Sequence, residues 1–173
     1  MPYEFHLKMT PRVVSTLPVA LNLGFAPTHD ATLTIVRDFL SGTGVDQIDC
    51  IHAKRHTILT GATEAVDLSG GANDAFGTAF PMVTLCGLIL INQDYDGTVN
   101  TTNLTIGGGA NAANILGNTT VTKTIRPGQM FMDINGGAGG IATITPGTAD
   151  IFQIVNAAGA TNNCQLIFFG RST

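Results

Sequence analysis

The chain is poor in charged residues, which make up 12% of its 173 positions, about half the usual share for a soluble domain. Glutamate occurs twice and lysine three times, although helix surfaces normally depend on both residues. We therefore expect little helix. A weakly charged surface also resists association poorly, which favours a protein that lives in an assembly.

Aromatic residues are scarce as well, at 6% of the chain with no tryptophan and two tyrosines. Such a chain is poorly equipped to stack sugars, which disfavours a glycosidase built on paired carboxylates from Asp46, Asp49, Glu64 and Asp67. The sequence has no GxSxG, GxGxxG or Gly-Lys-Ser/Thr motif. We therefore expect a protein that is not an enzyme, with no catalytic residues and no cofactor.

Cysteine and histidine form no pattern typical of metal ligands. Cys50, Cys86 and Cys164 lie far apart inside apolar runs, which predicts buried free thiols. The four histidines show no ligand spacing with them, so no metal site is expected. The net charge of −4 argues against nucleic acid as a partner. No secretory signal is visible near Met1, and the apolar run Leu85 to Ile91 is too short to span a bilayer, so we expect synthesis in a cytoplasm and no membrane partner.

The composition favours β structure instead. Glycine, with 21 residues, and threonine are abundant, and apolar stretches of strand length are separated by turn residues. The expected strands are 32–39, 45–54, 56–59, 65–68, 79–91, 99–106, 120–125, 129–134, 141–155 with a break at Pro146-Gly147, and 164–169. One helical turn is expected at Ala110 to Leu116. Roughly eight to ten strands predict an all-β fold, a single antiparallel β-sandwich of jelly-roll type.

The last third of the chain carries the clearest pattern. Turn sequences at Arg126-Pro127-Gly128, Asn135 to Gly137 and Asn156 to Ala160 separate its strands. Within the final strand, the alternation of side chains places Cys164, Leu166 and Phe168 on one face and Gln165, Ile167 and Phe169 on the other. Both faces of this strand are therefore partly apolar. One face is expected to cover the core, and the other is free to cover a partner.

The first thirty residues differ from the rest, because four prolines interrupt them and exclude a long helix or a central strand. We divide the chain into a Pro-rich extended N-terminal arm, residues 1–30, and a β-sandwich domain, residues 31–173. The arm packs either on its own domain or on a neighbouring subunit. Its candidate contact residues are Val13, Val14, Leu17, Leu21 and Leu23.

A small cluster of cations is the other candidate site. His52, Lys54, Arg55 and His56 stand together but have no nucleophile to serve. Lys54 and Arg55 are a possible charge patch between subunits, since arginine pairs well with carboxylates. A solvated strand end is the alternative interpretation.

Several short motifs stand out from Gly42 to the C-terminus: Gly42-Thr43-Gly44, Val66-Asp67-Leu68, Asp74-Ala75-Phe76-Gly77, Ile106-Gly107-Gly108, Arg126-Pro127-Gly128, Thr145 to Asp150 with Ile154-Val155-Asn156, and Ile167 to Ser172. These motifs resemble those of small virion proteins of tailed bacteriophages.

This resemblance implies a non-enzymatic structural protein, a capsid cement or decoration protein that binds the outside of the shell at subunit junctions and stabilises it. It implies the major capsid protein as partner and, because local three-fold sites favour trimers, a homotrimer. The location would be the exterior of the virion capsid, after synthesis in the cytoplasm of the host bacterium. The alternative is a tail, baseplate or spike component that binds a host glycan.

Overall fold

The computed structural model describes residues 5–9, 12–16, 28–32, 35–71, 77, 79 and 81–173. These residues form strands and turns and no helix, which confirms the predicted all-β class. The strands are β1 (Phe5–Met9), β2 (Arg12–Thr16), β3 (Thr28–Thr32), β4 (Ile35–Ser41), β5 (Gln47–Ile48), β6 (Cys50–Ile58), β7 (Thr63–Asp67), β8 (Thr84–Ile91), β9 (Leu104–Gly107), β10 (Thr122–Ile125), β11 (Met130–Ile134), β12 (Ala142–Thr143), β13 (Ile151–Asn156) and β14 (Asn162–Arg171).

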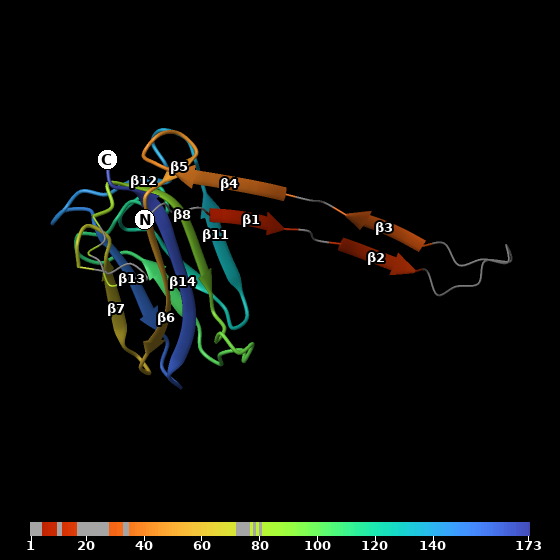
Figure 1. The fold of residues 1–173 in the computed structure, drawn as a ribbon. Helices are drawn as coiled ribbons and strands as arrows, with labels where there is room; N and C mark the ends of the chain where they lie inside the picture. Colours follow the sequence, from red (N-terminus) through yellow and green to blue (C-terminus); the bar gives the residue numbers. More distant parts are fainter. Residues whose placement is uncertain are drawn as a thin grey trace, which may run out of the picture.

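Two antiparallel sheets make up the body of the molecule (Figure 1). We call the sheet with strand order β11-β8-β14-β6 the front sheet; the short strand β12 also pairs with its β8. The back sheet has the order β10-β9-β13-β7. Strands β6 and β7 follow each other in the chain but lie at the edges of different sheets, so the turn between them crosses from one layer to the other.

The main core lies between these two sheets. Alternating residues of β14, among them Leu166 and Phe168, point toward Phe152 and Ile154 of the back sheet. The rings of Phe152 and Phe168 meet edge to face with centroids 5.0 Å apart, the geometry that aromatic quadrupoles favour. Each such side chain contributes about 1.5–3 kcal/mol when it leaves water.

The opposite face of the front sheet carries a second, smaller core. Phe39 and Ile48, from β4 and β5, pack there against Cys86 and Phe169. This explains why β8 is buried on both faces. From the sequence, the outer face of β14 was free to cover a partner. Part of this face is instead covered by β4 and β5 of the same chain.

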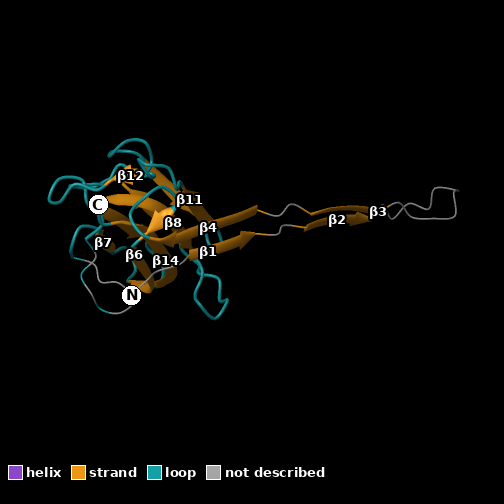
Figure 2. Cartoon of the chain, turned by 45° about the horizontal axis from the view of Figure 1, so that its top comes forward, coloured by secondary structure: helices purple, strands orange, loops and turns teal. Residues whose placement is uncertain are grey.

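The N-terminal strands form a two-stranded ribbon that leaves the sandwich (Figures 1 and 2). Strand β1 pairs with β4 along its whole length, and β2 pairs with β3. In both views the β2–β3 pair lies beyond β1 and β4, away from the two sheets. The boundary placed after residue 30 falls inside β3, the strand that returns toward the body.

Most predicted strands lie where their patterns placed them, including the break at Pro146-Gly147 between β12 and β13. Some bounds differ. The predicted strand 45–54 is divided at Asp49 into β5 and β6, and the predicted strand 99–106 begins only at Leu104.

The helical turn expected at Ala110 to Leu116 is wrong. The amide of Ala113 donates to the Ile151 carbonyl at 2.9 Å, and Ala112 bridges to Ile151 in parallel. Asn111 adopts a positive φ of 53°, which turns the chain toward β13 and prevents a right-handed helix from starting.

Candidate functional site

The root of the ribbon is fixed to the body by several contacts. Phe39 is 1% exposed and meets Phe169 edge to face with ring centroids 5.1 Å apart. The buried Arg171 guanidinium donates to the carbonyls of Gly44, Gly137 and Ala138 at 2.7–2.8 Å. These contacts join the loop before β5 and the loop after β11 to the end of β14, so the ribbon starts from a rigid base.

Beyond its root the ribbon exposes apolar side chains. Val36 and Leu40 of β4 are 52% and 58% exposed. They share a face with Asp38, whose carboxylate lies 2.9 Å from His6 Nδ1. The half-buried side chains of Leu7 and Met9 lie on the opposite face of β1. The ribbon thus presents apolar positions on both faces.

Two of the five candidate contact residues of the arm fall in the described part of the ribbon. Val13 and Val14 lie in β2, opposite Ala31 and Asp30 of β3. Leu17, Leu21 and Leu23 lie outside the described residues. The sequence did not indicate that β1 would pair with β4, or β2 with β3, because strands that are far apart in the chain leave no local signal of their pairing.

The cation cluster of the sequence is divided by the alternation of β6. His52 and His56 are buried on the inner face, whereas Arg55 lies on the outer face. Arg55 Nη2 is 2.8 Å from Asp94 Oδ2, and its guanidinium lies 5.3 Å from the centre of the Tyr95 ring. The charge of Arg55 is therefore paired within the chain, while Lys54 is exposed.

Asp94 belongs to the loop after β8. Gly97 N donates to the Asp94 carbonyl at 3.1 Å, and Thr98 N donates to the Asp96 carboxylate at 2.8 Å. The bond from the Thr98 amide is the main cause that holds the pKa of the Asp96 carboxyl below its usual range. Hydrogen bonds within the chain therefore hold residues 94–98 in a turn.

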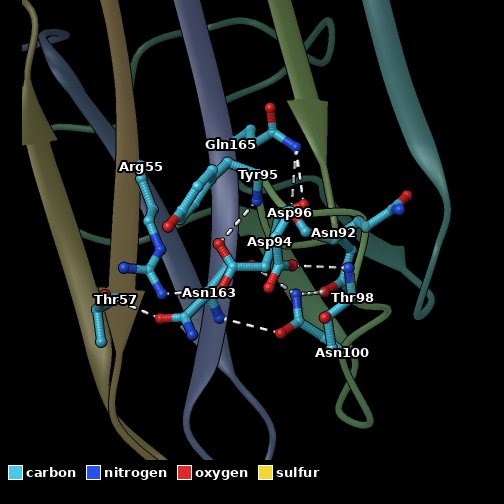
Figure 3. Close-up of polar contacts among 11 residues, drawn as sticks. Arg55, Thr57, Asn92, Asp94, Tyr95, Asp96, Thr98, Asn100, Asn163 and Gln165 are labelled. Carbon is cyan, nitrogen blue, oxygen red and sulfur yellow. Dashed lines mark hydrogen bonds and ion pairs between the residues drawn. The ribbon is translucent and has the colours of Figure 1, made fainter.

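A network of buried and half-buried asparagines adjoins this loop (Figure 3). Asn92 donates to the carbonyls of Thr102 and Ile125, and its own carbonyl oxygen accepts bonds from Asn100 and Asn162. Asn163 and Asn100 exchange two further bonds, so strand β14 is tied to the same loop. Sequence reasoning missed this network, since asparagine is also the usual residue of exposed turns.

Asn156 is a further asparagine, and its side chain forms hydrogen bonds to the neighbouring turns. Asn156 is 1% exposed, and its Nδ2 donates to the carbonyls of Ile58, Leu59 and Ala160 at 2.8–3.1 Å. Its Oδ1 accepts a bond from Thr102 Oγ1 at 2.6 Å. The polar side chains at this end of the sandwich therefore hold loops in place through hydrogen bonds within the chain, although the buried Oδ1 of Asn162 accepts none.

One buried group has the composition of a catalytic triad. His56 Nδ1 contacts the Glu64 carboxylate, and Cys164 lies directly opposite His56 on β14. Burial, with a smaller effect of the Glu64 charge, raises the pKa of the Cys164 thiol from 9.0 to about 12. The thiol therefore stays protonated and is no nucleophile. Nucleophilic catalysis gains no support from this cluster.

Three of the four carboxylates weighed for a glycosidase, those of Asp49, Glu64 and Asp67, serve separate structural contacts. Asp49 accepts bonds from the amide and hydroxyl of Ser172, Glu64 contacts His56, and Asp67 accepts bonds from Ser69. Within the described ranges, no three His, Cys, Asp or Glu residues are arranged to hold a metal ion. The described part of the chain also contains no helix with the length and apolar character needed to cross a bilayer.

Comparisons with protein families, with curated proteins and with solved structures found no match to this chain.

Proposed function

We propose that this chain is a non-enzymatic structural protein of a bacteriophage virion, a decoration protein that binds the outside of the capsid through its N-terminal ribbon. The observation that supports this most is the ribbon itself. A two-stranded ribbon has no core of its own and is at best marginally stable in water. Exposed Val36 and Leu40 add apolar surface to it. An outside partner would bury this surface.

The proposed fold of the body is a jelly roll. Its eight principal strands are divided between two sheets with the orders β11-β8-β14-β6 and β10-β9-β13-β7. Two interleaved Greek keys give this arrangement, which occurs in viral capsid and lectin domains. A rigid sandwich suits a protein that must resist deformation of a shell. The resemblance of its turns to those of phage virion proteins supports the same function.

The proposed partners are the major capsid protein and further copies of this chain. A homotrimer would match the local three-fold positions of an icosahedral shell. Charged residues make up 12% of the chain, and a weakly charged surface suits a protein held in an assembly. Exposed Lys54 remains available for a contact between subunits, whereas Arg55 would first have to leave Asp94.

Copy number in purified virions tests the proposal. We expect this chain in amounts comparable to the major capsid protein, as measured by quantitative mass spectrometry of intact particles. A handful of copies per particle would instead indicate the tail, baseplate or spike and would contradict the proposal. Removing the tails before the measurement distinguishes the two locations directly, because a decoration protein stays with the shells.

A further inference from the structure

The turn after β11 contains the one asparagine of the chain that precedes a glycine. Asn135 is exposed, and its side-chain carbonyl oxygen accepts a hydrogen bond from the Gly137 amide at 2.9 Å. Its Nδ2 donates to the Gly140 carbonyl at 2.6 Å. These two bonds hold the side-chain amide in one place within the turn, next to the peptide group that joins Asn135 to Gly136.

The Gly136 nitrogen is well suited to attack this side chain. Glycine has no Cβ, so no side chain crowds the nitrogen of residue 136. A bond between this nitrogen and Cγ of Asn135 closes a five-membered imide ring, and the reaction is favoured because both groups belong to adjacent residues of one chain. Negative charge develops on Oδ1 during the attack, and the hydrogen bond from the Gly137 amide stabilises it.

A carboxylate lies against the same glycine. A Cβ placed on Gly136 would overlap Oδ1 of Asp46, so this oxygen lies beside the Gly136 Cα, to which the attacking nitrogen is bonded. The Asp46 amide also donates to the Gly136 carbonyl at 2.9 Å, which keeps the two residues together. A carboxylate at this position can accept the proton that the nitrogen loses as it attacks, which is the role of a general base.

We propose that Asn135 is a site of spontaneous deamidation, with Gly136 as the nucleophile and Asp46 as the base. The Gly136 nitrogen bonds to Cγ of Asn135 and passes its proton through Asp46 to the leaving group, while the bond from Cγ to Nδ2 breaks and releases ammonia. Water then adds to one of the two carbonyls of the imide ring and opens it, which leaves aspartate or isoaspartate. Nothing is oxidised or reduced. The site does not depend on the proposed function.

The product changes the loop at the root of the ribbon. A carboxylate has no N–H to donate to the Gly140 carbonyl. Isoaspartate also lengthens the main chain by one carbon between two anchored groups. These are the Asn135 amide, which donates to the Cys86 carbonyl, and the Gly136 carbonyl, which accepts from Asp46. Because both anchors cannot keep their present spacing, the loop loosens its hold on Asp46 as the protein ages.

Peptide mass spectrometry of the native full chain, stored in mildly alkaline water labelled with heavy oxygen, tests the proposal. Asn118 is the matched control in the same molecule, because it is exposed and its Oδ1 also accepts a bond from the amide two residues later, but threonine follows it. Asn135 should convert to aspartate and isoaspartate with one labelled oxygen, severalfold faster than Asn118. Equal conversion at the two sites would overturn the proposal. So would an unchanged Asn135 over a period in which the urea-unfolded chain converts there.

Asp46→Asn tests the base. Asparagine tolerates the positive φ of 53° at this position and has nearly the same size, but its side-chain amide does not take up the proton. This variant should slow the conversion of Asn135 severalfold, whereas Asp38→Asn, a change at an exposed acid of the ribbon, should keep the wild-type rate. Conversion of Asp46→Asn at the wild-type rate would contradict the proposal. If Asp46→Asn does not fold, the comparison of Asn135 with Asn118 in the wild type still decides.

Discussion

The ring of Phe39 meets the ring of Phe169 edge to face, with centroids 5.1 Å apart, and so joins the ribbon to the front sheet. Phe169 lies opposite Gly87 of β8, where its ring occupies the space that a Cβ would need. The ring of Phe169 can therefore lie here only because Gly87 has no side chain. This stack connects β4, β14 and β8 and gives the ribbon a fixed starting point.

Replacing Phe39 with alanine should weaken this connection. Loss of a buried phenylalanine costs about 3–5 kcal/mol when the site cannot collapse. If the whole protein is destabilised, urea unfolding should show this loss of free energy. If the ribbon detaches while the sandwich stays folded, limited proteolysis should show new cleavage in the loop 42–46. Leu40→Ala is the control, because Leu40 is the neighbouring, exposed residue of the same strand. A Phe39→Ala protein as stable and as resistant as Leu40→Ala would contradict this role.

Substituting Gly87 with alanine should destabilise the protein from the other side of the stack. The new methyl group would overlap the Phe169 ring, and overpacking of this kind costs about 1–3 kcal/mol. Gly139→Ala serves as control, since a Cβ at Gly139 meets no atom within 4 Å. The measurement is the midpoint of thermal unfolding of the two variants, which should be lower for Gly87→Ala. Equal midpoints would show that the Phe169 ring moves aside freely.

Asn156→Ala should loosen the loops at the far end of the sandwich. The change leaves the carbonyls of Ile58, Leu59 and Ala160 without their shared donor. The Leu59 carbonyl keeps its bond from the Ala62 amide, whereas a buried group left unpaired costs about 1–3 kcal/mol. We expect faster hydrogen exchange in the turns 59–62 and 157–161 together with lower stability. Asn118→Ala, which removes one exposed hydrogen-bonded side chain, should change neither quantity.

Alkaline pH should destabilise the protein through Cys164. Its thiol pKa is raised from 9.0 to about 12 by burial, so the folded state keeps the proton that the unfolded state loses. The stabilisation is fully present below pH 9 and is lost as the pH rises toward 12, at about 1.4 kcal/mol per pH unit for one proton. Urea unfolding at pH 8 to 10 measures this slope. Cys164→Ala should reduce it, and an unchanged slope would show that the thiol does not contribute.

Local patterns predicted the parts of the fold that local chemistry controls. Pro146-Gly147 divided β12 from β13, and the alternation from Cys164 to Phe169 correctly separated the two faces of β14. The pairing of β1 with β4 and the covering of Phe169 by Phe39 could not be predicted, since both join residues remote in sequence. His56 and Glu64 likewise meet only because the β6–β7 turn crosses between sheets. Asn156 looked like a turn residue and proved to be a buried donor.

The most direct test of the ribbon as capsid attachment shortens it without disturbing its root. Met9 and Ile35 are directly paired, so a two-residue Asn-Gly hairpin turn can replace residues 10–34 and remove β2 and β3 while β1 and β4 remain. Cosedimentation with capsid shells that lack this protein measures binding, with Leu59→Ser, an exposed change on the body, as control. We predict that the shortened protein unfolds at the wild-type temperature but no longer binds shells, whereas Leu59→Ser binds normally. Full binding by the shortened protein would contradict the account.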